Sequence, residues 1–384
     1  MSKWKPVKLG EICEIVTGST PSTLKQEYWD GSFYWVTPAE ISDGDYYIER
    51  TQRKLTEAGI SSAGLRIMPV GTVLLSSRAP IGKVAITAVE MACNQGFKNL
   101  ICEEKIHNRF LYYFLKNNKH YLNSLGRGAT FKEISKSIVC EIEIPLPPLE
   151  EQKRIANILD KASNLIDLRK QQLEKMDLLI KSKFIDMFGD PVKNPKGWKV
   201  KSLKDIALGK LSYGSGASAT EYDLNVRYIR ITDINEKGCL NDFKVSPNEI
   251  SDEYILREGD ILFARSGATV GKTFRYSEKY GKCIYAGYLI RLVPNQKIVL
   301  PDYIYYFSRT DYYLSFVKQS MKTVAQPNIN AQQYGALQIP IPPLFLQNQF
   351  ASFVEKVEKQ KTVMQQSLGK LEMNYKALMQ EYFG

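Results

Sequence analysis

Residues 267–273 come closest to a catalytic motif, because they are rich in glycine and end in Gly-Lys-Thr. A phosphate-binding loop of this kind has four residues between its two glycines, so that backbone N–H groups can surround the phosphates. Only three residues separate Gly267 from Gly271. Residues 81–84 resemble the end of this motif, but there Lys83 is followed by Val84, which lacks the hydroxyl group that would bind magnesium. The spacing therefore argues against nucleotide binding.

The remaining reactive side chains offer no other active site. The six cysteines are scattered without a Cys-x-x-Cys pair, and His107 and His120 have no acidic partner placed for nucleophilic catalysis. Residues 103–105 contain the Glu-x-Lys fragment of metal-dependent nucleases, but no Pro-Asp precedes it. The Pro-Pro pairs at 147–148 and 342–343 lack the preceding Asn or Asp of an adenine methyltransferase motif. We therefore predict no catalytic site, no metal and no cofactor.

The net charge of +11 is unevenly distributed. Residues 1–144 carry 18 basic and 15 acidic side chains, and residues 190–339 carry 21 and 15. Segments 145–189 and 340–384 have a positive excess of only one each. A positive excess in two blocks favours a polyanionic partner. Since the sequence shows no signal peptide and no apolar run of about 20 residues, we expect a cytoplasmic protein with reduced thiols and no membrane association.

Residues 145–189 repeat without a gap at 340–384. The offset is 195 residues, and 13 of the 45 positions are identical. Both copies open with Pro-x-Pro-Pro-Leu, place Gln152 and Gln347 at matching positions, and close with Phe-Gly. Such self-similarity indicates a duplication.

Each copy has the pattern of one long helix. Its prolines precede the periodic stretch, where missing N–H groups cost little, and Gly189 provides a stop for the first copy. Apolar residues recur with a period near 3.5 over about four heptads, which favours a coiled coil formed by the two helices. Arg169 and Lys361 interrupt the stripe. Gly369 should cost its helix about 1 kcal/mol relative to alanine, so pairing must supply most of the stability. The predicted seam contains Leu159, Ala162, Ile166, Leu173, Met176 and Ile180 from the first helix, and Val354, Val357, Met364, Leu368, Leu371, Tyr375 and Leu378 from the second.

The blocks that flank the helices repeat more loosely. Residues 71–74 match 259–262, and the aromatic run 110–114 matches 303–307. Short β-branched and aromatic runs bounded by Gly, Asn or Asp predict strands between these landmarks. We predict an α+β protein with recognition domains at 1–144 and 190–339 and helical spacers at 145–189 and 340–384. The spacers should pair as an antiparallel coiled coil and give the domains a pseudo-twofold relation; in the alternative, the helices stay apart, each on its own domain.

This duplicated order resembles the specificity subunits of type I restriction–modification enzymes over all 384 residues. Residues 71–84, 259–272 and 126–134 look like parts of that family's recognition domains. The resemblance implies that each domain recognises half of a split, asymmetric double-stranded DNA target. It also implies that the paired helices fix the spacer and dock two methyltransferase subunits, and that motor-nuclease subunits complete the enzyme. Phe345-Leu346 replaces Glu150-Glu151 in the second copy, so the two ends should not offer partners identical polar contacts.

Base readout needs donors and acceptors that reach groove edges, whereas phosphate contacts need only positive charge. The loops around 127–132 and 322–328 supply both kinds of side chain. The predicted DNA-binding residues are Arg78, Lys83, Arg127, Thr130, Lys132, Arg265, Lys272, Lys322, Gln326 and Asn328. The alternative for each lysine is a solvated surface position. Four tyrosines should pack in the cores and not stack on bases: Tyr112, Tyr113, Tyr305 and Tyr306.

Two other functions fit a duplicated chain without a catalytic site. One is recognition of DNA for a different modification or phage-defence complex. The other is a coiled-coil scaffold that binds proteins without DNA specificity, which the charge excess in both blocks disfavours. Footprinting of a split DNA site would separate the scaffold from both recognition functions.

Overall fold

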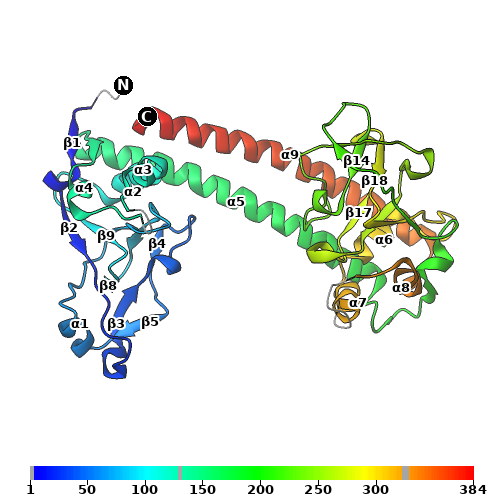
Figure 1. The fold of residues 1–384 in the computed structure, drawn as a ribbon, viewed down its shortest axis with the longest axis horizontal. Helices are drawn as coiled ribbons and strands as arrows, with labels where there is room; N and C mark the ends of the chain where they lie inside the picture. The colour runs from blue at the N-terminus through cyan, green and yellow to red at the C-terminus, as the bar shows by residue number, and fades with distance from the viewer. Residues whose placement is uncertain (1–3, 129–131, 322–327) are drawn as a thin grey trace. The chain divides into compact units, whose positions relative to one another are not determined.

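A computed structural model describes residues 4–128, 132–321 and 328–384 (Figure 1). The chain forms two compact units. Unit 1 contains Met1–Lys170 together with Gln366–Gly384, and unit 2 contains Gln171–Gln365. Each unit therefore combines one globular block with a part of each long helix.

The two long helices are α5, Leu149–Phe188, and α9, Leu344–Phe383, each of 40 residues. Their bounds differ by the same 195 residues that relate the sequence repeats. The helix α5 ends before Gly189, whose φ of +83° is a backbone conformation that favours glycine. Both predicted helices are confirmed.

Within unit 1, the end of α9 lies along the beginning of α5. Met379 and Phe383 of α9 share a hydrophobic core with Ile155 and Leu159 of α5. Farther along, Lys170 forms an ion pair of 3.1 Å with Glu372. Residue numbers rise on one helix as they fall on the other, so the pairing is antiparallel.

Within unit 2, the beginning of α9 lies along the end of α5. The Phe350 ring centroid is 5.5 Å from that of Phe184 and 5.3 Å from that of Phe188. Lys361 forms an ion pair of 2.6 Å with Asp177. The predicted antiparallel pairing is therefore confirmed, and the alternative in which the helices stay apart is wrong.

The predicted seam residues are all shielded from solvent to some degree. Those that are buried are Leu159, Ile166, Ile180, Val354 and Val357. Those that are partly buried are Ala162, Leu173, Met176, Met364, Leu368, Leu371, Tyr375 and Leu378. Burial of Lys361 alone would lower its pKa, but hydrogen bonds to Asp177 and Glu358 raise it above the usual value.

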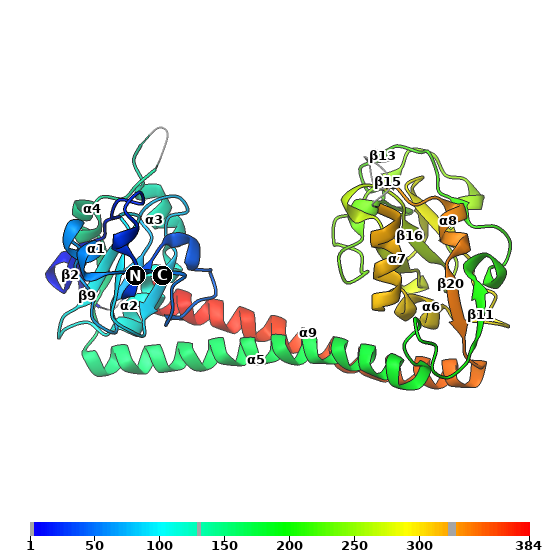
Figure 2. The same cartoon turned by 90° about the horizontal axis from the view of Figure 1, so that it is seen from below.

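The block of unit 1 is built on a five-stranded sheet in the order β2-β9-β6-β7-β4. These strands are β2 Cys13–Thr17, β9 Lys98–Cys102, β6 Val73–Leu75, β7 Val84–Thr87 and β4 Tyr47–Ile48. A second sheet has the order β5-β3-β8, and β1 pairs with β10; their bounds are β5 Arg53–Leu55, β3 Trp29–Val36, β8 Met91–Cys93, β1 Pro6–Lys8 and β10 Glu143–Pro145. The helices are α1 Glu57–Ser62, α2 Asn108–Asn117, α3 Lys119–Leu125 and α4 Lys136–Cys140. Figure 2 shows α3 farther from α5 than α2 is.

The block of unit 2 has a corresponding four-stranded sheet in the order β12-β19-β16-β17. These strands are β12 Ser212–Tyr213, β19 Leu289–Leu292, β16 Ile261–Ala264 and β17 Thr273–Arg275. Three strand pairs lie outside it: β11 Lys199–Ser202 with β20 Gln338–Ile341, β13 Ala219–Thr220 with β15 Ser246–Pro247, and β14 Arg227–Ile229 with β18 Cys283–Tyr285. The helices are α6 Pro301–Phe307, α7 Asp311–Met321 and α8 Ala331–Ala336.

The aromatic run that follows each sheet packs inward, as predicted. Tyr112 and Tyr113 on α2 are 0% and 1% exposed. Tyr305 and Tyr306 on α6 are partly buried against the core of unit 2. These tyrosines therefore belong to the framework of the two units.

Candidate DNA interface

Arg78 follows β6 in unit 1 and contacts Glu133, which lies 55 positions later in the sequence. Its Nε donates a hydrogen bond of 2.9 Å to Oε2 of Glu133. Lys98, 6% exposed in its side chain, donates at 3.0 Å to Oε1 of the same carboxylate. Burial alone would raise the pKa of Glu133, but the hydrogen bonds from Lys98 and Arg78 lower it below its usual value. One carboxylate therefore holds two cations in place.

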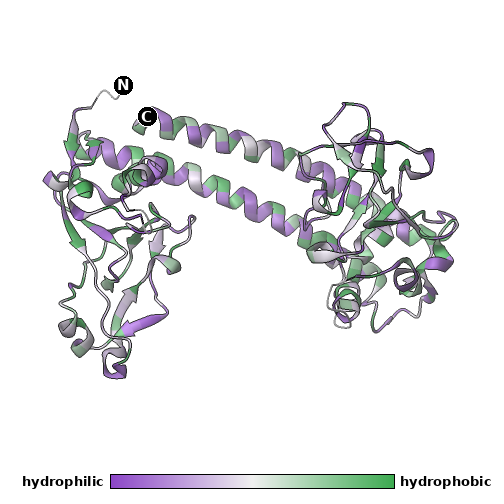
Figure 3. Ribbon diagram, in the orientation of Figure 1, coloured by the Kyte–Doolittle hydropathy of each residue, from purple (hydrophilic) through white to green (hydrophobic). Residues whose placement is uncertain are grey.

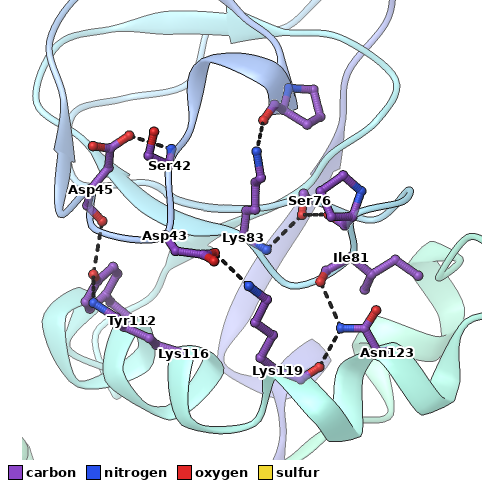
Figure 4. Close-up of polar contacts among 12 residues, drawn as sticks. Ser42, Asp43, Asp45, Ser76, Ile81, Lys83, Tyr112, Lys116, Lys119 and Asn123 are labelled. Atoms are coloured by element: carbon purple, nitrogen blue, oxygen red, sulfur yellow. Dashed lines mark hydrogen bonds and ion pairs between the residues drawn. The ribbon is translucent and has the colours of Figure 1, made fainter. Parts of the chain in front are cut away.

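Lys83 is tied to its own domain (Figure 4). Its Nζ donates to the carbonyl oxygen of Pro38 at 2.9 Å, and its backbone N–H donates to Oγ of Ser76 at 2.8 Å. One of the three N–H donors of its ammonium group is therefore used inside unit 1, where it helps to position the turn. The same turn is fixed to α3, since Asn123 Nδ2 donates to the carbonyl oxygen of Ile81 at 3.0 Å.

The segment after α3 presents two exposed cations. Arg127 pairs with Glu133 through backbone hydrogen bonds of 3.0 and 2.9 Å, one in each direction. The side chains of Arg127 and Lys132 are exposed. Thr130 lies outside the described residues. The structure therefore brings Arg78, Arg127 and Lys132 to one edge of unit 1.

Unit 2 builds a comparable site from different side chains. Arg265 follows β16, and its Nε donates to Oδ1 of Asn328 at 3.3 Å. Its guanidinium carbon lies 4.7 Å from the ring centroid of Tyr213, a distance at which cation–π attraction stabilises the pair. Lys322 and Gln326 lie outside the described residues. Tyr213 was not found from the sequence because it lies in a short strand far from the candidate loops.

Lys272 resembles Lys83 because its amino group also contacts acceptors within its own unit. Its Nζ lies 2.8 Å from a carboxylate oxygen of Glu236 and 3.3 Å from the carbonyl oxygen of Ile234, and its side chain is 18% exposed. The two lysines occupy equivalent turns: Gly82 and Gly271, which precede them, have φ of +87° and +85°. A side chain at either glycine would be strained.

The glutamine of each helix leader explains how a block is attached to its helix. In unit 1, Gln152 is 0% exposed, and its Oε1 accepts from the N–H of His107 at 2.8 Å. Its Nε2 donates to the carbonyl oxygens of Lys105 and Pro147 at 2.9 and 2.8 Å. The side chain thus satisfies one buried and two partly buried backbone groups between β9 and α5.

Gln347 repeats this arrangement in unit 2. Its Oε1 accepts from the N–H of Leu300 at 2.8 Å, and its Nε2 donates to the carbonyl oxygens of Ile298 and Pro342 at 3.2 and 2.8 Å. The repeat in sequence marked both glutamines, but only the structure shows their partners.

Unit 1 has a further attachment to α5 through Asp160. Its Oδ1 accepts from the hydroxyls of Tyr46 and Tyr113 at 2.6 and 2.7 Å, and Arg109 pairs with its Oδ2. Burial, reinforced by Asp160, raises the pKa of both tyrosines, so the hydroxyls remain donors at neutral pH. These residues were not selected from the sequence because Asp160 is remote from each of them.

Comparisons with known proteins agree with the duplicated architecture. The chain matches the family described as type I restriction modification DNA specificity domain over residues 1–177 and again over 195–373. The chain therefore belongs to that family. The type I restriction enzyme MjaIX specificity subunit of Methanocaldococcus jannaschii is 32% identical and aligns over 94% of this chain and 89% of its own. The MjaVIII specificity subunit of the same organism is 22% identical over 98% and 91%.

Two solved structures share the fold. The type I restriction-modification S subunit from M. genitalium has a TM-score of 0.60 at 17% identity, with 100% of this chain and 96% of that chain covered. A chain from work on complex assembly and conformational transition of the type I R-M system has a TM-score of 0.61 at 18% identity, with coverage of 99% and 97%.

No three His, Cys, Asp or Glu side chains among the described residues are grouped so as to hold a metal ion. No helix in the same part of the chain combines the length and apolar character needed to cross a membrane.

Proposed function

We propose that each unit reads one half of a bipartite, asymmetric double-stranded DNA target. The observation that carries this proposal is a site that occurs in both units with different side chains. In each unit, an arginine that follows β6 or β16 donates through Nε to a side chain from a distant segment. Arg78 meets a carboxylate at this site in unit 1, whereas Arg265 meets an amide and a tyrosine in unit 2. Because base readout depends on the donors and acceptors presented, two such sites should prefer different half-sites.

We further propose that the paired helices set the spacer between the half-sites and dock the methyltransferase subunits, which motor-nuclease subunits join in the full enzyme. Apolar and polar residues alternate along α5 (Figure 3), and leucines remain exposed on it. Leu165 and Leu168 in unit 1 are 51% and 55% exposed, and Leu178 in unit 2 is 61% exposed. Exposed apolar residues on an elongated helix support docking of a protein partner. In this proposal the chain is cytoplasmic and performs no catalysis itself.

The spacer role is tested by removing one heptad from both helices, residues 169–175 and 363–369. Each deletion removes seven residues of its helix and leaves the ion-paired Asp177 and Lys361 in place. Seven residues at 1.5 Å each shorten a helix by about 10.5 Å while rotating it by only about 20°. At about 3.4 Å per base pair, the DNA spacer should shorten by roughly three base pairs.

The assay maps methylated adenines in DNA of a host that carries the chain with its methyltransferase subunits. Both half-sites should be retained while the spacer changes. The control removes residues 169–175 alone, which breaks the helix register and should reduce co-purification with the methyltransferase. Altered half-sites with an unchanged spacer in the double deletion would reject the proposed role of the helices.

A further inference from the structure

Arg78 and Arg265 share one hydrogen-bonding state. In each arginine, Nε donates to a side chain of its own unit, to Glu133 at 2.9 Å or to Asn328 at 3.3 Å. Neither Nη group of either arginine has a hydrogen-bond partner among the described residues. Each unit therefore presents a guanidinium fixed at one edge, with the two terminal nitrogens available.

Backbone pairing with Glu133 and Ile134 fixes the position of Arg78 in unit 1. The N–H of Ile134 donates to the carbonyl oxygen of Ser77 at 2.9 Å, and Arg78 pairs as an antiparallel bridge with Glu133. Arg78 thus lies one residue after the position that bonds Ile134.

In unit 2 the equivalent hydrogen bond involves Arg265 itself. The N–H of Ile329 donates to the carbonyl oxygen of Arg265 at 2.8 Å, and Ser266 forms the bridge with Asn328. Arg265 therefore corresponds in backbone position to Ser77 and not to Arg78. The two arginines start from neighbouring positions but reach the equivalent partner, Glu133 or Asn328.

Each partner side chain is itself held. Lys98 donates to the second oxygen of Glu133 at 3.0 Å. The ring of Tyr213 stacks with Arg265, and its hydroxyl accepts from the N–H of Ala331 at 3.1 Å. Each guanidinium is therefore held through Nε by a side chain of its own unit, and in unit 2 also by an aromatic ring.

We propose that Arg78 and Arg265 each read one guanine, through Nη1–H and Nη2–H donated to O6 and N7 in the major groove. This inference rests on the proposed function and adds the base and the reading atoms. Bidentate arginine–guanine pairing is the commonest specific contact in protein–DNA complexes. A guanidinium that is already held loses less freedom when it forms two parallel bonds. Such bonds carry sequence information when they are made to a base edge, whereas bonds to a phosphate do not.

The electrostatic settings of the two arginines differ. Glu133 offsets one of the two positive charges of Arg78 and Lys98, and the side chain of Arg78 is 46% exposed. Asn328 and Tyr213 carry no charge, so Arg265 keeps its full charge. The guanine contact in unit 2 should therefore weaken more steeply as salt concentration rises.

The experiment uses the full chain in complex with its methyltransferase subunits. Methylated-adenine sequencing first defines the split site of the wild-type complex. Methylation rates are then measured on duplexes in which each guanine of the site is replaced singly by 7-deazaguanine, which lacks the N7 acceptor. In the wild type, one such guanine per half-site should matter. Replacing that G·C pair by A·T should cost roughly 5- to 150-fold, as about 1–3 kcal/mol of base discrimination implies.

Arg265→Ala should remove sensitivity to 7-deazaguanine at one position in one half-site, and leave the other half-site unchanged. Arg78→Ala should do the same in the other half-site. Arg265→Lys keeps the positive charge but loses the planar fork, so it should weaken discrimination at that guanine without slowing methylation of every duplex. Exposed arginines that precede β6 and β16 serve as matched controls: Arg66→Ala in unit 1 and Arg257→Ala in unit 2 should leave every guanine preference intact.

Three results would overturn the inference. The first is a half-site without guanine. The second is persistent 7-deazaguanine sensitivity in the matching alanine variant. The third is a variant that slows methylation of every duplex by one factor, which would indicate a phosphate contact. Failure of the wild-type complex to methylate any split site would instead reject the proposed function. Co-purification with the methyltransferase and unchanged thermal unfolding establish that each variant is folded.

Discussion

Replacing Gln347 by leucine should detach the block of unit 2 from the start of α9. Gln347 is 1% exposed and makes three hydrogen bonds to backbone groups. Leucine has a similar size but no polar atoms, so the partly buried N–H of Leu300 would lose its acceptor. A buried donor without a partner costs about 1–3 kcal/mol. The two carbonyl oxygens would lose one donor each, a smaller cost because each oxygen has a second lone pair.

The combined loss should be about 2–4 kcal/mol, part of which the apolar leucine side chain offsets. For a unit of this size, each kcal/mol lowers Tm by about 2–4 °C, so we expect a decrease of roughly 5–15 °C. Gln347→Glu should be more destabilising at pH 8 than at pH 5. Its carboxylate would face two carbonyl oxygens, and only the protonated acid could donate to one of them.

Hydrogen exchange measured by mass spectrometry locates the effect. The amide of Leu300 and the first turns of α9 should lose protection, while the core of unit 1 should not. The matched control is Gln349→Leu, two residues farther along α9, where the side chain is exposed. If both variants lowered Tm equally, or if protection fell first in unit 1, then the three hydrogen bonds of Gln347 would not be what attaches the block to the helix.

Two pH-dependent effects follow from the ion pairs. Because the folded pKa of Lys361 is raised, its stabilising contribution is complete below its usual pKa of 10.5 and is lost as the pH rises through the folded value. The difference in Tm between the wild type and Lys361→Met should therefore be constant at neutral pH and change only above about pH 10.5. The folded pKa of Glu133 is lowered, so its contribution is present above its usual value of 4.5 and is lost as the pH falls through the folded value. Glu133→Gln should remove that acid-dependent part of unfolding in unit 1, and an unchanged acid profile would contradict the ion pairs with Arg78 and Lys98.

The helices and their pairing could be predicted because their signals are local and duplicated. A constant offset, a shared leader and an apolar period near 3.5 all agree over both copies, and α5 and α9 have matching bounds. The coiled-coil seam follows from the same period, because residues that recur on one face of a helix are the ones that a partner helix can cover.

The arginine sites could not be predicted at the same level because their geometry is non-local. Arg265 and Asn328 are 63 positions apart, and Tyr213 comes from another strand. The match of residues 71–74 with 259–262 places Arg265 at the position of Ser77, but it does not show that Arg78 and Arg265 reach equivalent partners, Glu133 and Asn328. Pattern alone likewise could not show that Lys83 and Lys272 use their amino groups within their own units.

The glutamines that attach each block to its helix are the same in both units, whereas the arginine sites differ. Burial explains this difference. Gln152 and Gln347 are buried and satisfy equivalent backbone groups, so almost any substitution would leave a donor or acceptor without a partner. Arg78 and Arg265 lie at the edges of the units, where replacing the arginine itself leaves no buried group unpaired and costs little stability. Such a chain can therefore acquire a new preference in one half-site through exposed residues, while the buried glutamines continue to join each block to its helix.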